Sequence, residues 1–243
     1  MSKKIIAIVP SAGLGKRFDP HIRKTFADLG GTPLLVHTLK RLSSEYLITE
    51  IIPVLGKDDV GKGYLMVENF GLKKIKLIAP GGKERQDSIF NALNLLEENG
   101  TSTASIILIH DGVRPFIPEG LVERLIGELK NFDGVVPGLP VKETLKEVDA
   151  GGAVISTVNR ERFRSVQTPQ AFSFGSIKKA YDAAYAEGFY ATDDAALVER
   201  MGGRVKIIPG SPLNIKVTTP EDMELVVNLL KMRESREVVI RKS

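Results

Sequence analysis

The sequence contains no cysteine, which excludes disulfide bonds, thiolate catalysis and zinc sites with cysteine ligands. It also lacks a long apolar run, because no stretch approaches the roughly 20 apolar residues that a membrane-spanning helix requires. The apolar run at residues 5–9 is too short for a signal peptide, since Lys16 and Arg17 follow almost at once. We therefore expect a cytoplasmic protein that does not bind membranes.

The basic residues lack the pattern of a nucleic-acid-binding protein. The net charge is only +4, and the 34 Lys and Arg residues are spread along the chain without interleaved aromatic residues. Small anionic ligands explain the positive charge more economically than nucleic acid does. The 243 residues, 42% of them hydrophobic, fit one folded α/β domain over residues 1–243.

Apolar, β-rich segments alternate with segments of helical periodicity along most of the chain. The nearly continuous apolar runs IIAIV and SIILI are typical of strands buried on both faces of a sheet. The alternation predicts a doubly wound, mostly parallel sheet with helices on both faces. The predicted strands are 4–9, 50–55, 75–78, 105–110, 134–136 and 204–208. The predicted helices are 33–42, 87–98, 118–130, 176–187, 193–201 and 220–234, followed by a frayed terminus REVVIRKS.

Residues 140–159 break this alternation. Two strand-like halves flank the turn sequence 149–152, DAGG, which predicts a hairpin. The halves carry few large apolar residues, and a two-stranded ribbon is only marginally stable alone. We expect an arm, at about 140–162, that protrudes from the domain and contacts another surface. The alternative is an exposed β-excursion without a partner.

The first strand leads into a loop of small residues followed by cations. Small side chains would let a polyphosphate approach the backbone N–H groups closely, and Lys16, Arg17 and Lys24 add positive charge. Phe18 replaces a glycine of the dinucleotide fingerprint, and the loop lacks the glycine and hydroxyl spacing of a Walker loop. The alternative is a tight turn with solvated cations. The small residues are Ser11, Ala12, Gly13 and Gly15.

Further polar clusters follow other predicted strands or precede helices, namely PGGKERQDS at 80–88, IHDGVRPF at 109–116, ATDDAA at 191–196 and NIKVTTPED at 214–222. A carboxylate at the tip of a central strand, beside phosphate-binding loops, is suited to Mg²⁺. Asp111 occupies that position, although it could instead cap the following loop. The spacing of the three histidines does not suggest metal ligands, so we expect His110 to order its loop.

The segments PSAGLGKRF, GGKERQDS, HDGVRPF, VKET, TVNRERF, QTPQ, TDD and NIKVTTPED resemble, in order and over nearly the whole chain, the 2-C-methyl-D-erythritol 4-phosphate cytidylyltransferase family of the non-mevalonate isoprenoid pathway. The resemblance implies a Rossmann-like nucleotidyltransferase fold, the substrates CTP and methylerythritol phosphate, the cofactor Mg²⁺, and a homodimer formed by exchange of the β-arm.

The resemblance also implies roles for individual residues. Those implied to bind the nucleotide are Pro10, Ser11, Ala12, Gly13, Gly15, Lys24, Gly82, Arg85, Ser88 and Asp111. Those implied to bind the acceptor are Arg17, Asp111, Arg114, Thr144, Arg160, Thr168, Thr192, Asp193 and Lys216, with Thr144 and Arg160 reaching the site from the arm of the partner subunit. Arg17, Lys24 and Lys216 are implied to be catalytic, and Asp111 to bind Mg²⁺.

The implied reaction needs no nucleophile from the protein. The acceptor phosphate attacks the α-phosphorus of CTP in line and pyrophosphate leaves, so the site mainly has to offset the repulsion between two anions. One alternative is a cytidylyltransferase for another polyol phosphate, such as ribitol 5-phosphate. Another is a non-catalytic nucleotide-binding module, which would not require Arg17, Lys24 and Asp111 together.

Overall fold

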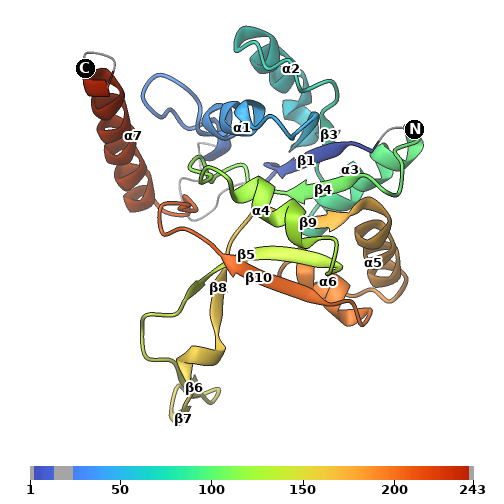
Figure 1. Cartoon of the computed structure of the whole chain (residues 1–243), viewed down its shortest axis with the longest axis vertical. Helices are drawn as coiled ribbons and strands as arrows, with labels where there is room; N and C mark the ends of the chain where they lie inside the picture. Colours follow the sequence, from blue (N-terminus) through green and yellow to red (C-terminus); the bar gives the residue numbers. More distant parts are fainter. Residues whose placement is uncertain (1–2, 14–23, 241–243) are drawn as a thin grey trace.

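The computed structural model describes residues 3–13 and 24–240, with side chains as far as residue 232. One eight-stranded sheet runs in the order β10-β5-β9-β4-β1-β2-β3, and β8 pairs with β5 (Figure 1). Its strands are β1 (Ile5–Pro10), β2 (Glu50–Leu55), β3 (Ala79–Pro80), β4 (Ile106–Ile109), β5 (Gly134–Pro140), β8 (Arg164–Val166), β9 (Gln170–Ser173) and β10 (Val205–Pro209). A separate hairpin contains β6 (Lys146–Val148) and β7 (Val154–Thr157).

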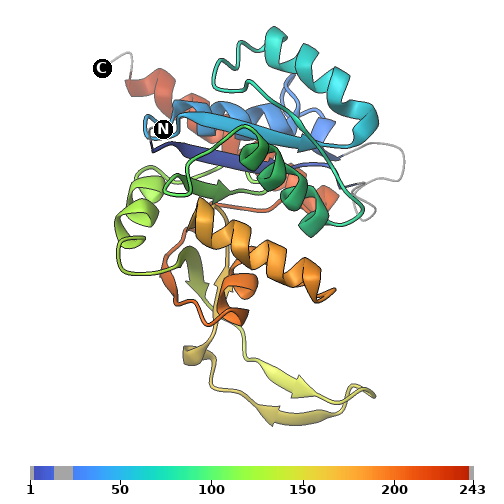
Figure 2. The ribbon, with the colours of Figure 1, turned by 90° about the vertical axis from the view of Figure 1, so that its right-hand side faces the viewer.

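Helices cover both faces of this sheet (Figure 2). Successive side chains of a strand point to opposite faces, so in β1 Ala7 and Val9 join one core cluster while Ile6 and Ile8 join another. The first cluster includes residues of α1 (Leu34–Ser44), α2 (Val60–Asn69) and α4 (Leu121–Glu128). The second includes residues of α3 (Arg85–Glu98), α5 (Phe174–Ala186) and α6 (Asp194–Arg200). The doubly wound arrangement is therefore confirmed.

The sheet is mostly parallel, as predicted, but β9 was not predicted. This strand lies antiparallel between β4 and β5, with Ala171 and Phe172 fully buried. Four residues are too few to give a clear alternation in the sequence. The predicted strand 75–78 was also misplaced, because only an isolated bridge joins Ile75 to Ile51 and the paired strand is β3.

Two helices differ from expectation. Helix α2 was not predicted, and its Gly63 lies against Leu55, where a Cβ atom would come within 2.4 Å of a Leu55 methyl group. The glycine that weakens the helical signal thus permits close packing on the sheet. Helix α7 (Pro220–Ile240) continues through most of the segment that we expected to fray. Its predicted start is confirmed, since the Thr219 hydroxyl accepts a 3.4 Å hydrogen bond from the Asp222 N–H.

The predicted arm is present and extends away from the sheet in both views (Figures 1 and 2). Asp149 shapes its turn, because one carboxylate oxygen accepts hydrogen bonds from the N–H groups of Gly151 and Ala153. The apolar side chains of Val148, Val154 and Ile155 are all more than half exposed. The hairpin therefore buries no core of its own.

Candidate functional site

Strands β1, β2, β3 and β4 are parallel, so the loops that follow them meet at one edge of the sheet. Glycine contacts show how closely these loops approach. A Cβ atom at Gly81 would lie 2.2 Å from the Cβ atom of Ala12, and one at Gly112 would lie 2.1 Å from the Ser11 hydroxyl oxygen. The three motifs PSAG, PGG and HDG are thus in contact, and glycine is required where they touch.

The first loop is built differently from our expectation at one residue. The Ser11 N–H donates to the Val54 carbonyl of β2 at 2.8 Å. Because this N–H already has an acceptor within the sheet, it cannot also bind a phosphate. Ser11 contributes through its small, buried side chain. Pro10 ends β1, and a Cβ atom at Gly13 would contact nothing within 4 Å.

The rest of this cationic segment is only partly within the described chain. Lys24 is the first residue of η1 (Lys24–Phe26), a single 3-10 turn. Gly15 and Arg17 lie outside the described residues. Their predicted roles remain predictions.

The second loop is fixed by the start of α3. The Gly82 N–H donates to the Ser88 hydroxyl oxygen at 3.1 Å, and this hydroxyl donates to the Glu84 carbonyl at 3.0 Å. Glu84 and Asp87 form a reciprocal capping box. The structure therefore brings the predicted residues Gly82 and Ser88 together at a helix N-terminus that two acidic side chains already cap, an arrangement that suits a polar group without negative charge.

A charge cluster lies at the end of β4, on the same edge. Asp111 is buried, and its two carboxylate oxygens contact three cations: Lys216 Nζ at 2.9 Å, Arg114 Nε at 3.4 Å and Arg85 Nε at 3.4 Å. Burial opposes ionisation of Asp111, but Arg85, Lys216 and Arg114 together hold the pKa of its carboxyl group well below the ordinary value. Asp111 is therefore ionised at neutral pH, and its negative charge holds three cationic side chains together.

Segments distant in sequence support this cluster. The Arg114 guanidinium donates to the Asn214 carbonyl at 2.7 Å, and the Val217 N–H donates to the Val113 carbonyl at 3.0 Å. These bonds fasten the strap 214–217, which follows β10, to the loop after β4. The Asn214 side-chain amide in turn donates to the Thr168 carbonyl at 2.7 Å. The predicted residues Arg114, Thr168 and Lys216 are thus brought together around Asp111.

His110 orders this loop, as expected. Its Nε2–H donates to the Arg114 carbonyl at 3.0 Å, so Nδ1 must accept the 3.0 Å hydrogen bond from the Thr168 hydroxyl. The same hydroxyl oxygen accepts from the Asp111 N–H at 3.1 Å. Burial lowers the pKa of His110 to about 4, so the ring is neutral at pH 7. A neutral ring with both nitrogens occupied is suited to holding backbone in place.

Four of the predicted residues lie elsewhere or serve other contacts. Thr144 and Arg160 belong to the arm, which points away from the sheet, and the Arg160 guanidinium donates to the Lys142 carbonyl. Asp193 is the N-cap of α6, accepts from the Ala196 N–H at 3.1 Å and is also bound by Gln170. Thr192 precedes it and is exposed.

Sequence reasoning missed Asp194 and Tyr181. Both side chains are almost fully buried, and Asp194 holds Arg85 with two hydrogen bonds of 3.0 and 2.7 Å while accepting a 2.6 Å bond from the Tyr181 hydroxyl. The two adjacent acids in ATDDAA were the available signal. Nothing in the sequence distinguishes which of them caps the helix and which pairs with an arginine 109 residues away.

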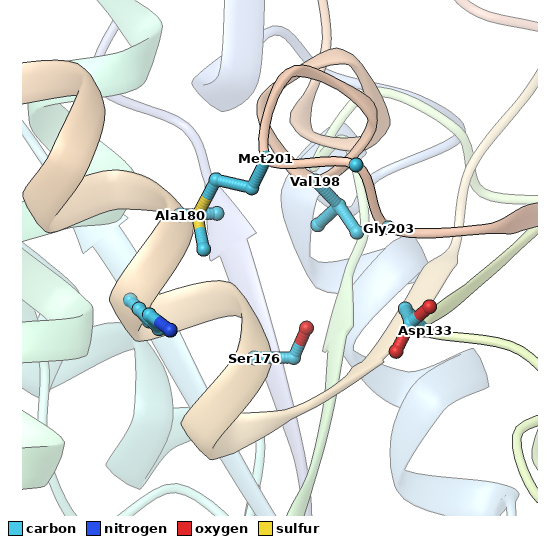
Figure 3. A pocket seen from close by; sticks show the side chains of 8 residues that line it. Asp133, Ser176, Ala180, Val198, Met201 and Gly203 are labelled. Carbon is cyan, nitrogen blue, oxygen red and sulfur yellow. The ribbon is translucent and has the colours of Figure 1, made fainter.

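A separate pocket of about 310 Å³ opens beside α5 and α6 (Figure 3). Its lining includes Asp133 and Gly203, which precede β5 and β10 and so mark the opposite edge of the sheet. None of the predicted site residues lines it.

The charge cluster fits Mg²⁺ only together with a phosphate ligand. Among the side chains that the structure describes, in residues 3–13 and 24–232, no three of His, Cys, Asp or Glu gather closely enough to hold a metal ion. Mg²⁺ often takes one or two carboxylates and completes its coordination with phosphate oxygens and water. Asp111 could supply one such oxygen, although both of its oxygens already contact cations. In the same described residues, no helix combines the length and apolarity needed to cross a membrane.

The mostly parallel sheet, whose carboxyl edge carries three loops in contact and a cluster of cations around one carboxylate, has the α/β nucleotidyltransferase fold, which it shares with the solved structures given below. The model of the 2-C-methyl-D-erythritol 4-phosphate cytidylyltransferase (IspD) family matches residues 5–232, and the chain belongs to this family.

Relatives and solved structures agree. The enzyme of that name from Syntrophus aciditrophicus is 41% identical over 97% of this chain and 100% of its own length, and the one from Geotalea uraniireducens is 41% identical over 94% and 97%. The crystal structure of 4-diphosphocytidyl-2C-methyl-D-erythritol synthase from Anaerococcus prevotii has a TM-score of 0.80 at 33% identity, over 94% of this chain and 96% of that one. The Thermus thermophilus cytidylyltransferase has a TM-score of 0.73 at 30% identity, over 94% and 99%.

Proposed function

We propose that the site at the carboxyl edge transfers a cytidylyl group from CTP to 2-C-methyl-D-erythritol 4-phosphate and releases pyrophosphate. The observation that carries this proposal is the contact of the first glycine loop with both the second glycine loop and the Asp111 loop, which would place a nucleotide beside three cations. The test is a pyrophosphate-release assay with CTP and the acceptor. Ribitol 5-phosphate, the alternative acceptor, is assayed in parallel, and faster turnover with it would overturn the acceptor assignment.

The chemistry follows from the charges of the two substrates. An oxygen of the acceptor phosphate forms a bond to the α-phosphorus of CTP, and the bond from that phosphorus to the bridging oxygen of the β-phosphate breaks, with the electron pair leaving on pyrophosphate. The acceptor phosphate is already ionised at neutral pH, so no general base is needed. Lys24 and Arg17 would stabilise the charge that develops on the phosphoryl oxygens. Lys216 and Arg114, held by Asp111, would orient the acceptor phosphate.

The nucleotide would lie across the two glycine loops. Ala12, Gly13 and Gly15 would leave room for the triphosphate beside the first loop, while Gly82 and Ser88 would border the base and ribose. The fixed hydrogen bonds between Gly82, Ser88 and Glu84 support this assignment, because a preformed loop loses little entropy when it binds a ligand. Thr168 and Thr192 would contribute hydroxyl groups on the acceptor side. Asp193, whose carboxylate caps α6 and accepts from Gln170, would border that side without turning its carboxylate to the acceptor.

Mg²⁺ would be held by Asp111 together with triphosphate oxygens, and it would supply positive charge that offsets the repulsion between the two substrates. The test is a titration of activity with Mg²⁺ in Asp111→Asn. The expected result is a Mg²⁺ requirement shifted to higher concentration, whereas Asp58→Asn, which alters an exposed acid in η2 (Lys57–Asp59), should titrate like the wild type. Superimposable titration curves for Asp111→Asn and the wild type would remove Asp111 from the metal site.

The arm would complete the acceptor site of a second subunit in a homodimer. Its support is physical, since Val148, Val154 and Ile155 are exposed on a hairpin without a core and would gain by burial against a partner. Thr144 and Arg160 would then enter the partner's site, with the Arg160 guanidinium on the acceptor phosphate. Sedimentation analysis is expected to show a dimer. Deleting residues 146–157 should yield a monomer if the arm forms the interface.

A further inference from the structure

We propose that Asp194 is a positioning residue that prevents Arg85 from closing a two-point ion pair with Asp111, and so keeps Lys216 on Asp111. This inference rests on the proposed acceptor site, because its consequence is the placement of a cation that would bind the acceptor phosphate. The Asp194 side chain forms hydrogen bonds with Arg85 and Tyr181, and of these two residues Arg85 is the one with a predicted substrate role. Its effect therefore has to pass through the Arg85 guanidinium.

The geometry shows how Arg85 is divided between two carboxylates. Both terminal nitrogens of its guanidinium donate to Asp194, at 3.0 and 2.7 Å. Only Nε faces Asp111, at a longer distance of 3.4 Å. A planar guanidinium binds a carboxylate most strongly when two of its nitrogens bind the two oxygens side by side. Asp194 has this arrangement and Asp111 does not.

Asp194 is fixed firmly enough to maintain that division. Its side chain is 1% exposed, and it is the first residue of α6, whose N-cap is Asp193. The oxygen that receives one Arg85 nitrogen also accepts the 2.6 Å hydrogen bond from the Tyr181 hydroxyl of α5. Two helices therefore set the position of this carboxylate.

Loss of the Asp194 carboxylate would affect Oδ2 of Asp111, the oxygen that Arg85 does not contact. It contacts Lys216 Nζ at 2.9 Å and Arg114 Nε at 3.4 Å. If Asp194 were replaced by asparagine, an amide NH₂ would face a guanidinium NH₂, and Arg85 would lose one of its two acceptors. The guanidinium would then turn to Asp111 and take both of its oxygens. Lys216, which is 42% exposed and ends in a flexible chain, is the cation that would be displaced.

The nucleotide loop should be insensitive to this change. Its conformation depends on the Glu84–Asp87 capping box and on the bond from the Gly82 N–H to Ser88, and neither involves the Arg85 side chain. The Arg85 guanidinium is directed to Asp194 and Asp111, so in this proposal Arg85 acts through these carboxylates and not on the nucleotide. The proposal therefore predicts a selective effect. Asp194→Asn should weaken acceptor binding and turnover but leave CTP binding nearly unchanged.

The experiment measures KM for both substrates in the full-length protein, with Tyr181→Phe as the matched control. Asp194→Asn is expected to raise the acceptor KM about tenfold or more and the CTP KM less than about threefold, because small displacements of a positioning group are costly. Tyr181→Phe removes a buried hydrogen bond to the same carboxylate but leaves both Arg85 contacts. It should lower the melting temperature with little change in either KM. Asp194→Ser is measured in parallel. We expect the same changes in the two KM values as for Asp194→Asn.

A double variant tests the mechanism itself. Arg85→Gln/Asp194→Asn lacks the guanidinium that would capture Asp111, so its acceptor KM should be lower than that of Asp194→Asn alone. The proposal is overturned if the acceptor KM of the double variant is higher than that of Asp194→Asn. It is also overturned if Tyr181→Phe raises the acceptor KM as much as Asp194→Asn does. A wild-type protein inactive with CTP and methylerythritol phosphate would instead overturn the proposed function.

Discussion

Gly81 and Ala12 approach so closely that a Cβ atom on the glycine would lie 2.2 Å from the Cβ atom of Ala12. The two residues belong to loops after different strands, β3 and β1, and the Gly81 N–H also donates to the Leu55 carbonyl at 2.6 Å. A methyl group there cannot be accommodated by rotating a side chain, because a loop backbone must move. The width of the proposed nucleotide site is thus set by a contact between small residues.

Gly81→Ala should separate these loops. We expect a CTP KM raised about tenfold or more and a stability loss of about 1–3 kcal/mol, as overpacking typically causes. Gly61→Ala is the matched control, because a Cβ atom in that exposed position of α2 meets nothing within 4 Å, and alanine favours helix. Steady-state kinetics and thermal unfolding of both variants check the prediction. A CTP KM unchanged in Gly81→Ala would mean that the loop contact does not shape the nucleotide site.

Lys24→Ala and Arg17→Ala should fold normally and lose turnover by a factor of hundreds or more, as removal of a preorganised charge stabiliser typically does. The reason is the position of both residues next to the first glycine loop. The measurement is kcat at saturating concentrations of both substrates, with circular dichroism as the check on folding. Two folded variants with near-normal kcat would remove these residues from the catalytic machinery.

Asp87 gives a prediction about pH and stability. Burial raises the pKa of this carboxyl group, but hydrogen bonds from Tyr185, the Glu84 N–H and Tyr190 outweigh burial, and the net shift is downward. A lowered pKa means that the carboxylate stabilises the fold above the unfolded-state value of about 3.9, and that this stability is lost as the pH falls through the folded-state value. Asp87→Asn should therefore cost about 1–2 kcal/mol at pH 7.

The difference between Asp87→Asn and the wild type should begin to shrink as the pH falls below about 4, where the unfolded chain binds a proton first, and should continue to shrink until the pH has passed the lower folded-state pKa. Urea unfolding at pH 7, 5 and 3 measures it. Tyr190→Phe removes one exposed hydrogen bond to the same carboxylate and should have a smaller effect with the same sign. A difference that stays constant from pH 7 to pH 3 would contradict the assigned role of the charge.

The sequence carried most of the information about the sheet and about which loops meet at its carboxyl edge, since long apolar runs and glycine loops are local signals. Strand β2 has the predicted bounds, and the hairpin turns at Asp149–Gly152 as expected. The failures have a common origin in tertiary context. Strand β9 is too short to show the alternation of apolar and polar residues that predicts a strand. It forms because its backbone pairs with both β4 and β5, which are distant from each other in sequence.

The site shows the same division between local and distant information. Asp111 was identified because it follows an apolar strand, whereas Asp194 acts through Arg85, 109 residues away. That pairing depends on how α3 and α6 are placed on the sheet. A pair of adjacent acids gives no indication of its partner until the fold brings the helices together.

The proposed exchange of arms gives the sharpest test of the assembly. Arg160→Ala and Lys24→Ala subunits should each be nearly inactive as homodimers, because one lacks the guanidinium delivered by the arm and the other a cation of the site itself. When the two variants exchange subunits, one site of the heterodimer carries both lesions and the other carries neither. Activity should therefore return towards half the wild-type level per heterodimer. Arg162→Ala, in the same 3-10 turn η3 (Arg160–Arg162), is the matched control and should remain active alone. Demonstrated exchange without any return of activity would show that Arg160 does not act on the partner's site.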